Sequence, residues 1–178
     1  MRSEADVALL LSFVNTRSAM PDDFRSPERL HRWLVSSGLL AEDEAVGPDD
    51  ALRAVHLRAA FISLLHEAHG MPPNPRTRPT IEEVTQRAPL GIVVQGRELT
   101  FQPGGAPGDR ALGAILAALL RIQLRGELDR VKACKNCGQG FWDTSKNRSR
   151  LWCDMAVCGA QAKARAYRER QRAQKAAQ

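Results

Sequence analysis

Four cysteines carry the clearest chemical signal in the sequence. Two residues separate Cys134 from Cys137, fifteen residues follow, and four residues separate Cys153 from Cys158. The short first gap lets two sulfurs face one point from a tight turn, and four thiolates at tetrahedral corners are the ligand set of a structural zinc site. Clustered cysteines in a cytosolic chain are metal ligands more often than disulfides. The sequence therefore predicts one zinc ion held by these four residues.

Other interpretations of the cysteines stay open at this point. Cys134 and Cys137 have the spacing of a thiol redox pair, but no βαβ pattern surrounds them and the second pair would be unexplained. An iron–sulfur cluster also uses four cysteines, although this spacing is closer to that of zinc knuckles. Four unrelated structural cysteines are the third alternative. A site with four thiolate ligands has no open coordination position, and the chain contains no G-x-S-x-G, P-loop or dinucleotide-binding motif, so we expect no enzyme activity.

Basic residues surround and follow the cysteines. Residues 131–178 contain 11 Lys and Arg against 3 Asp and Glu, a net charge of +8, whereas residues 1–130 contain 15 against 17, a net charge of −2. Such an asymmetry predicts that the basic part binds a polyanion. The alternative is a solvated basic helix without a partner. We expect phosphate contacts from a turn before the second cysteine pair and from a helix after it, through Lys146, Arg148, Arg150, Lys163, Arg165, Arg168 and Arg172.

The elements that must position these groups can be predicted in outline. Residues 141–143 and 151–152 are expected to form short aromatic strands around a polar turn at residues 145–149. The segment after Cys158 is rich in Ala, Arg, Gln and Lys, which favour a helix. A period of 3.6 residues places Arg165, Arg168 and Arg172 on one face of this helix, with Lys163 and Arg170 nearly opposite.

Residues 1–130 are expected to form a mainly helical domain, with residues 131–178 as the zinc module, and the short linker between them predicts that the two units touch. Apolar residues recur at helical spacing, and Ser, Pro and Gly mark helix ends. Alternating apolar residues on both sides of Gly96-Arg97 predict one β-hairpin, at residues 90–95 and 98–102. The fold class is therefore mainly α (α+β). Helices are expected at residues 5–15, 27–37, 48–69, briefly after a capping box formed by Thr80 and Glu83, and at 111–124 with Asp109 as N-cap.

Several motifs resemble a known pair of domains. Cys134-Lys-Asn-Cys137, Asp143-Thr-Ser-Lys-Asn147, the run from Trp152 to Gly159, and Lys163-Ala-Arg165-Ala-Tyr167-Arg168 are similar to the CGNR-type zinc finger. Phe13-Val-Asn15-Thr16 and the run from Leu30 to Leu40 resemble its partner, the ABATE domain. This resemblance implies a small treble-clef-like zinc finger and a bacterial stress-induced transcription regulator. The sequence departs from the name-giving motif, because Ala160-Gln161 stand in place of Asn-Arg.

These observations together predict a zinc-dependent DNA-binding transcription regulator that acts on duplex DNA. The alternative is a zinc-stabilised module for protein interaction or dimerisation, with no direct DNA contact. The N-terminal domain is expected to sense a small-molecule effector or to form a homodimer. Asn15 and Thr16 are candidates for an effector pocket, with a helix C-cap as their alternative role. The apolar helix at residues 111–124, which is long for such a domain, favours a dimer.

The predicted location is the cytoplasm, without a membrane partner. The longest apolar stretches are too short to span a bilayer. The first residues include acids where a signal peptide needs a basic start and an apolar run.

Overall fold

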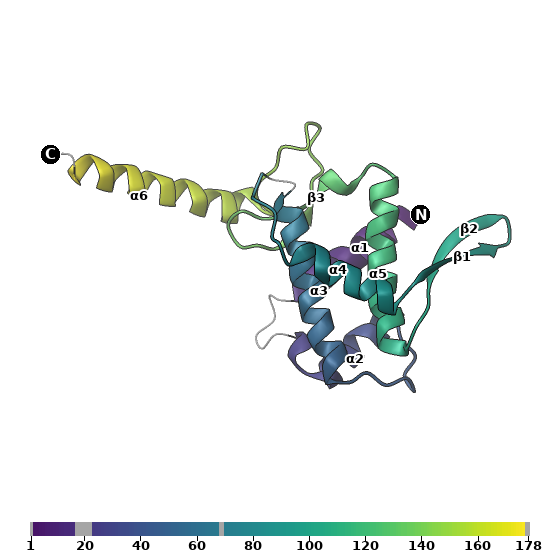
Figure 1. The fold of residues 1–178 in the computed structure, drawn as a ribbon. Helices are drawn as coiled ribbons and strands as arrows, with labels where there is room; N and C mark the ends of the chain where they lie inside the picture. The colour runs from purple at the N-terminus through teal and green to yellow at the C-terminus, as the bar shows by residue number, and fades with distance from the viewer. Residues whose placement is uncertain (1, 17–22, 68–69, 177–178) are drawn as a thin grey trace.

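The computed structural model describes residues 2–16, 23–67 and 70–176, which form a helical body with a hairpin and a long helix projecting from it (Figure 1). The hairpin and the long helix leave the body on opposite sides in this view. The body contains α1 (Arg2–Asn15), η2 (Asp23–Arg25), α2 (Pro27–Ser36), α3 (Pro48–Glu67), α4 (Thr77–Arg87), α5 (Pro107–Leu124) and η3 (Leu128–Arg130). Among the described residues, no helix combines the length and apolar character needed to cross a membrane.

Two antiparallel hairpins complete the fold. Strand β1 (Leu90–Gln95) pairs with β2 (Glu98–Pro103), and the turn between them uses Gly96 at a φ of 63°. Near the cysteines, β3 (Val131–Ala133) pairs with β4 (Gly140–Trp142). A π turn, η4 (Met155–Gly159), then leads into the projecting helix α6 (Ala160–Ala176). The predicted mainly helical fold with a hairpin at residues 90–102, a four-cysteine cluster and a C-terminal helix is confirmed, and the second strand runs one residue further than predicted.

Helix α5 forms the centre of the core. It packs against α1, α4 and β2, and its buried residues include Leu112, Ile115 and Ile122. Gly113 permits the close approach of the neighbouring segment, because a Cβ atom there would lie only 2.7 Å from the Cβ of Ala88. Burial within its own domain accounts for the apolar composition of α5. The apolar character of this helix is therefore no indication of a dimer surface.

Two helix starts differ from the sequence expectations. Helix α4 begins at Thr77, and the hydroxyl of Thr80 donates to the carbonyl of Arg76 at 2.9 Å instead of capping a new helix, so the capping-box prediction is wrong. Helix α5 begins at Pro107, whose fixed φ suits the first turn. The predicted N-cap, Asp109, is buried inside that turn and accepts from Nε of Arg87 at 3.0 Å.

The core continues from the helices into the zinc module. Val131 and Ala133 of β3 are buried in the same hydrophobic cluster as Phe13, Phe61 and Leu65. Strand β3 lies against α3, and β4 lies against α1. The short connection at η3 thus leaves the two parts of the chain in direct contact, as expected from its length.

Candidate metal centre and nucleic-acid interface

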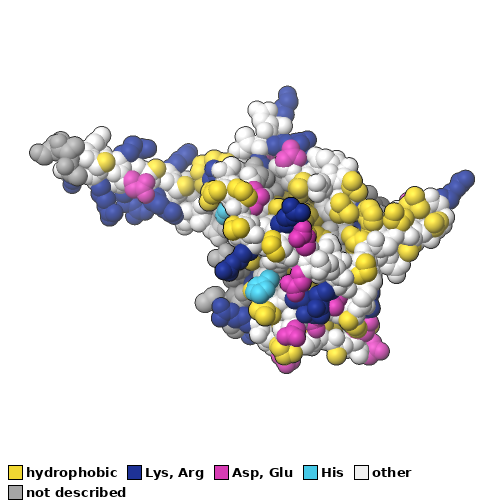
Figure 2. Space-filling model, viewed as in Figure 1, with side chains coloured by type: hydrophobic (Ala, Val, Ile, Leu, Met, Phe, Trp, Pro, Cys, Tyr) yellow, Lys and Arg dark blue, Asp and Glu magenta, His cyan; other side chains and the backbone are white. Residues whose placement is uncertain are grey.

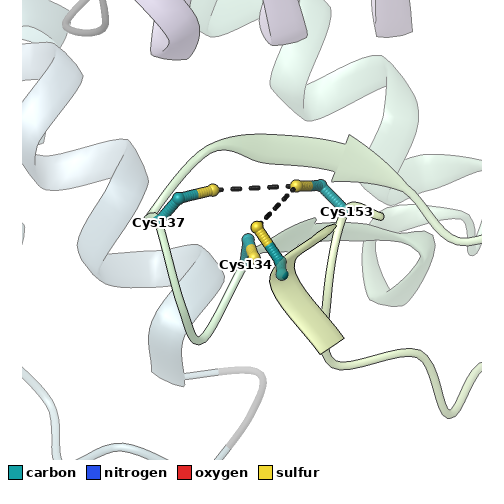
Figure 3. A group of neighbouring side chains, drawn as sticks. Cys134, Cys137 and Cys153 are labelled. Carbon is teal, nitrogen blue, oxygen red and sulfur yellow. Dashed lines mark hydrogen bonds between the residues drawn. The ribbon is translucent and has the colours of Figure 1, made fainter. Parts of the chain in front are cut away.

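The four cysteine sulfurs converge at one point. Cys134 and Cys137 lie in the turn between β3 and β4, where Gly138 has a φ of 76° and its amide donates to the carbonyl of Cys134 at 2.8 Å. Cys153 comes from the loop before η4, and Cys158 lies in η4 itself. The labelled side chains point inward toward one another (Figure 3). All four Sγ atoms lie within 4.8 Å of one another.

This arrangement fits a zinc ion. A zinc–sulfur bond of about 2.3 Å in a tetrahedron places the sulfurs about 3.8 Å apart. The observed Sγ–Sγ distances are 3.6 Å between Cys137 and Cys153 and 3.7 Å between Cys153 and Cys158, and all four cysteines are free rather than disulfide-bonded. Four thiolates around one point make a closed, structural zinc site of the kind that the cysteine spacing predicts.

The surroundings of Cys134 and Cys153 shift the pKa values of their thiols in opposite directions. Burial raises the pKa of Cys153, and the three neighbouring sulfurs raise it further. For Cys134, backbone amides of the knuckle outweigh the effect of burial and lower the pKa to about 6. The thiol of Cys134 therefore ionises readily. Ionisation of Cys153 is unfavourable, because it would place a second negative charge beside the first. A bound divalent cation reduces that conflict, because it attracts all four thiolates and lowers the net charge of the cluster from 4− to 2−.

The strand pairing of the zinc module differs from the sequence expectation. Strand β4 pairs with β3, and residues 151–152, which were expected to be a strand, have no regular structure. A backbone hydrogen bond from the amide of Lys135 to the carbonyl of Leu151, at 3.0 Å, holds the latter segment beside the knuckle. Strand β4 pairs with β3 because Val131 holds β3 in the main core, where its backbone groups are in place to form hydrogen bonds with β4.

A buried ion pair supports the loop between the two cysteine pairs. Asp143, with none of its surface exposed, accepts from Nζ of Lys132 at 2.7 Å and from the amides of Ser145 and Arg150 at 2.8 and 2.9 Å. Burial would raise the pKa of Asp143, but the hydrogen bonds from Lys132 and Ser145 outweigh it and hold the pKa well below the usual range. Lys132 also donates to the carbonyl of Arg148. The pair thereby orders the loop that carries Lys146 and Arg148.

Asn15 joins the helical body to the zinc module. Its Oδ1 accepts from the amide of Gly140 at 2.7 Å, and its Nδ2 donates to the carbonyl of the same residue at 3.0 Å. The hydroxyl of Thr16 donates to the carbonyl of Phe13 and accepts from Arg58. The polar groups of both residues are thus engaged within the fold, and the effector pocket suggested for them stays a prediction.

Helix α6 is anchored at its base, and most of its described residues beyond the base are exposed. Asp154 is the N-cap residue of η4 and accepts from the amide of Val157 at 2.8 Å. Asn136 of the knuckle donates to Oε1 of Gln161 at 2.8 Å and accepts from Arg165 at 2.7 Å. Gln161, which replaces the arginine of the family motif, therefore ties the helix to the zinc knuckle.

The structure divides the expected nucleic-acid contacts into two groups. Lys and Arg side chains gather along the projecting helix (Figure 2). Among the expected contacts, the first group is exposed on that helix and on the loop, namely Lys146, Lys163, Arg165, Arg168 and Arg172. The other two expected contacts bond to groups of the protein itself. Arg148 is exposed and pairs with Asp129. Arg150 is half-buried, its guanidinium carbon lies 5.4 Å from the centroid of the Phe141 ring, and its side chain donates to the carbonyl of Cys153 at 2.7 Å.

Sequence reasoning missed the residues that support the site. Asp154 carried a recognisable signal, since Asp is a preferred N-cap residue ahead of a helical run. No sequence signal marked the ion pair of Lys132 with Asp143 or the hydrogen bonds of Asn15 with Gly140. Each joins residues that meet only in the folded chain.

The fold and the site define a two-part protein, in which a helical domain holds a four-cysteine zinc finger with a basic helix. The chain belongs to the ABATE family: the family model described as "Putative stress-induced transcription regulator" matches residues 8–130, and the model of the CGNR zinc finger matches residues 130–171. Both resemblances seen in the sequence are thereby confirmed. Among curated proteins, the comparison finds no match to this chain.

Proposed function

We propose that the protein regulates transcription by binding duplex DNA through the cationic face of α6, presented by the zinc finger. The observation that carries this proposal is the position of α6, which is anchored at its first turns and then extends away from the body (Figure 1). No other described element covers α6 beyond its first turns, and a helix of this length has the dimensions to lie in or along a DNA groove.

The charge of the helix supports a polyanionic partner. Six Lys and Arg residues lie between Lys163 and Lys175, with Glu169 as the single acid. A helix this cationic repels itself in isolation, and an array of phosphates relieves that repulsion. The ordered loop between the two cysteine pairs adds Lys146 as a further exposed cation. Most contacts are expected to be with phosphates, which position the protein without reading sequence.

The remaining parts of the proposal follow from the chemistry of the chain. A closed four-thiolate site is suited to structure rather than catalysis, so we propose a protein without enzyme activity. The helical domain would sense an effector or assemble copies of the chain. The cytoplasm is the proposed location, since four reduced cysteines are stable there.

A salt series with three variants tests DNA binding. Replacing Arg168 and Arg172 with Gln keeps helix propensity and leaves the zinc knuckle untouched. Each lost phosphate contact is expected to reduce the slope of log K against log salt by about 0.9. Arg165→Gln is examined separately, because Arg165 also bonds Asn136. The matched control replaces Lys163 and Arg170, on the opposite side of the helix, and is expected to have the smaller effect.

The outcome also separates the two function classes. Binding to random duplex that weakens steeply with salt, and less steeply in the Arg168/Arg172 variant, supports the proposal. If the zinc-loaded protein does not bind duplex at low salt, or if the double variant matches the wild type in affinity and slope, the basic face is not a DNA contact. The zinc finger would then be a protein-interaction module.

A further inference from the structure

The β1–β2 hairpin has one entirely apolar face. Side chains alternate between the two faces of a strand, and the register pairs Leu90 with Pro103, Ile92 with Phe101 and Val94 with Leu99. These six side chains therefore share one face of the ribbon. The other face carries Gly91, Val93, Gln95, Glu98, Thr100 and Gln102.

The outer part of this face is not covered by the described chain. Ile92, Val94 and Leu99 are 69%, 71% and 73% exposed, whereas Phe101 and Pro103, nearer the body, are half-buried. The ribbon projects past α5 (Figure 1), and hydrophobic side chains gather along it (Figure 2). A two-stranded ribbon has little stability of its own in water and gains it when a hydrophobic face is packed. Large apolar residues in contiguous exposed positions mark an interaction surface.

The charge of the hairpin limits what can cover this face. Residues 90–103 hold one cation and one anion, Arg97 and Glu98, at the turn. A nucleic acid or an anionic membrane surface would require an excess of cations, which the ribbon lacks. The occupant must instead present an apolar face with balanced charge at its edge.

A second copy of the same ribbon meets these requirements. The cross-strand pairs Ile92–Phe101 and Val94–Leu99 make an apolar ladder that is similar on both strands, so two ladders related by a twofold axis can cover one another. Two copies that met through α6 would bring like charges together. The hairpin lies on the opposite side of the body from that helix, so association there avoids this repulsion (Figure 1).

We propose that the β1–β2 hairpin is a dimerisation surface, on which the apolar faces of two copies pack against each other about a twofold axis. Pairing of strand edges would leave the exposed side chains in water, whereas packing of the faces buries them. An interface centred on three exposed side chains per copy is small, so the dissociation constant is expected to be on the order of 10 µM. The inference does not depend on DNA binding.

Sedimentation equilibrium of the zinc-loaded full chain, without nucleic acid, tests the proposal from micromolar to hundreds of micromolar concentration. Val94→Glu places a charge in the apolar face and is expected to weaken dimerisation at least tenfold. Gln102→Glu adds the same charge to the opposite face of the same ribbon, and is expected to dimerise like the wild type. Circular dichroism and zinc content show whether each variant is folded, and Leu99→Gln provides an uncharged second variant.

A charge exchange makes the test specific for two copies. Val94→Glu and Val94→Lys are each expected to be monomeric alone and to recover dimer when mixed, since opposite charges would then meet across the twofold interface. A wild-type protein that sediments as a monomer throughout the range would show that a second copy does not cover the hairpin. Dimers that persist in folded Val94→Glu and Leu99→Gln would place the interface elsewhere. Either result overturns the proposal.

Discussion

Replacing Asn15 with aspartate is expected to loosen the attachment of the zinc module to the helical body. In the wild type the side-chain amide of Asn15 bonds to both backbone polar groups of Gly140. Its Oδ1 accepts from the backbone N–H of Gly140 at 2.7 Å, and its Nδ2 donates to the backbone carbonyl at 3.0 Å. Aspartate has nearly the same size and keeps the acceptor. It replaces the donor with an oxygen, so a carboxylate oxygen would face the carbonyl oxygen of Gly140.

The expected cost follows from the burial of these groups. Gly140 is buried, and a Cβ atom at this position would lie 2.5 Å from Cγ2 of Val14, so the backbone has no room to move closer to the helix. A buried polar group that loses its partner costs about 1–3 kcal/mol, and the repulsion between two oxygens adds to this. We expect a loss of about 2–4 kcal/mol in the free energy of unfolding, which is a large part of the stability of an ordinary domain.

Denaturant unfolding in excess zinc measures this loss. Asn147→Asp, an identical chemical change at an exposed position of the zinc module, is the matched control and is expected to leave stability within about 0.5 kcal/mol of the wild type. Zinc content should remain at one ion per chain in both variants, because neither position holds the metal. If Asn15→Asp unfolds at the same denaturant concentration as Asn147→Asp, the Asn15–Gly140 hydrogen bonds do not hold the two parts together.

Two further predictions concern the zinc module itself. Cys158→Ser is expected to abolish binding of the single zinc ion and to unfold the module while most of the helical body remains, as measured by elemental analysis and circular dichroism; full zinc occupancy in this variant would contradict the assigned ligand set. Asp143→Asn leaves the buried ammonium of Lys132 without its anion and is expected to cost about 3–5 kcal/mol in denaturant unfolding. Because the pKa of Asp143 is lowered in the folded protein, the difference between wild type and variant should persist at pH values above the unfolded carboxyl pKa of about 3.9, and shrink as pH falls below it toward the folded pKa. A difference that already disappears between pH 7 and pH 5 would refute this account.

The elements that the sequence alone determined are those governed by local spacing. The four cysteines could be assigned to one metal because a C-x2-C turn brings two sulfurs together whatever the rest of the chain does. The β1–β2 hairpin followed from alternating apolar residues around Gly96, and the cationic face of α6 followed from helical periodicity. In each case the interacting residues are neighbours along the chain, so the pattern contains the geometry.

Tertiary structure decided the features that join distant segments. Strand β4 pairs with β3 rather than with residues 151–152, because β3 is held in the main core by Val131. Asn15 bonds Gly140, 125 residues away, although its position at a helix end suggested a cap or a pocket. The apolar helix α5, whose length favoured a dimer, is largely buried in its own domain, while three exposed apolar side chains lie on the hairpin. Composition and periodicity indicate that a side chain will be buried or will bind a partner. Only the folded chain determines which segment buries it or which group it binds.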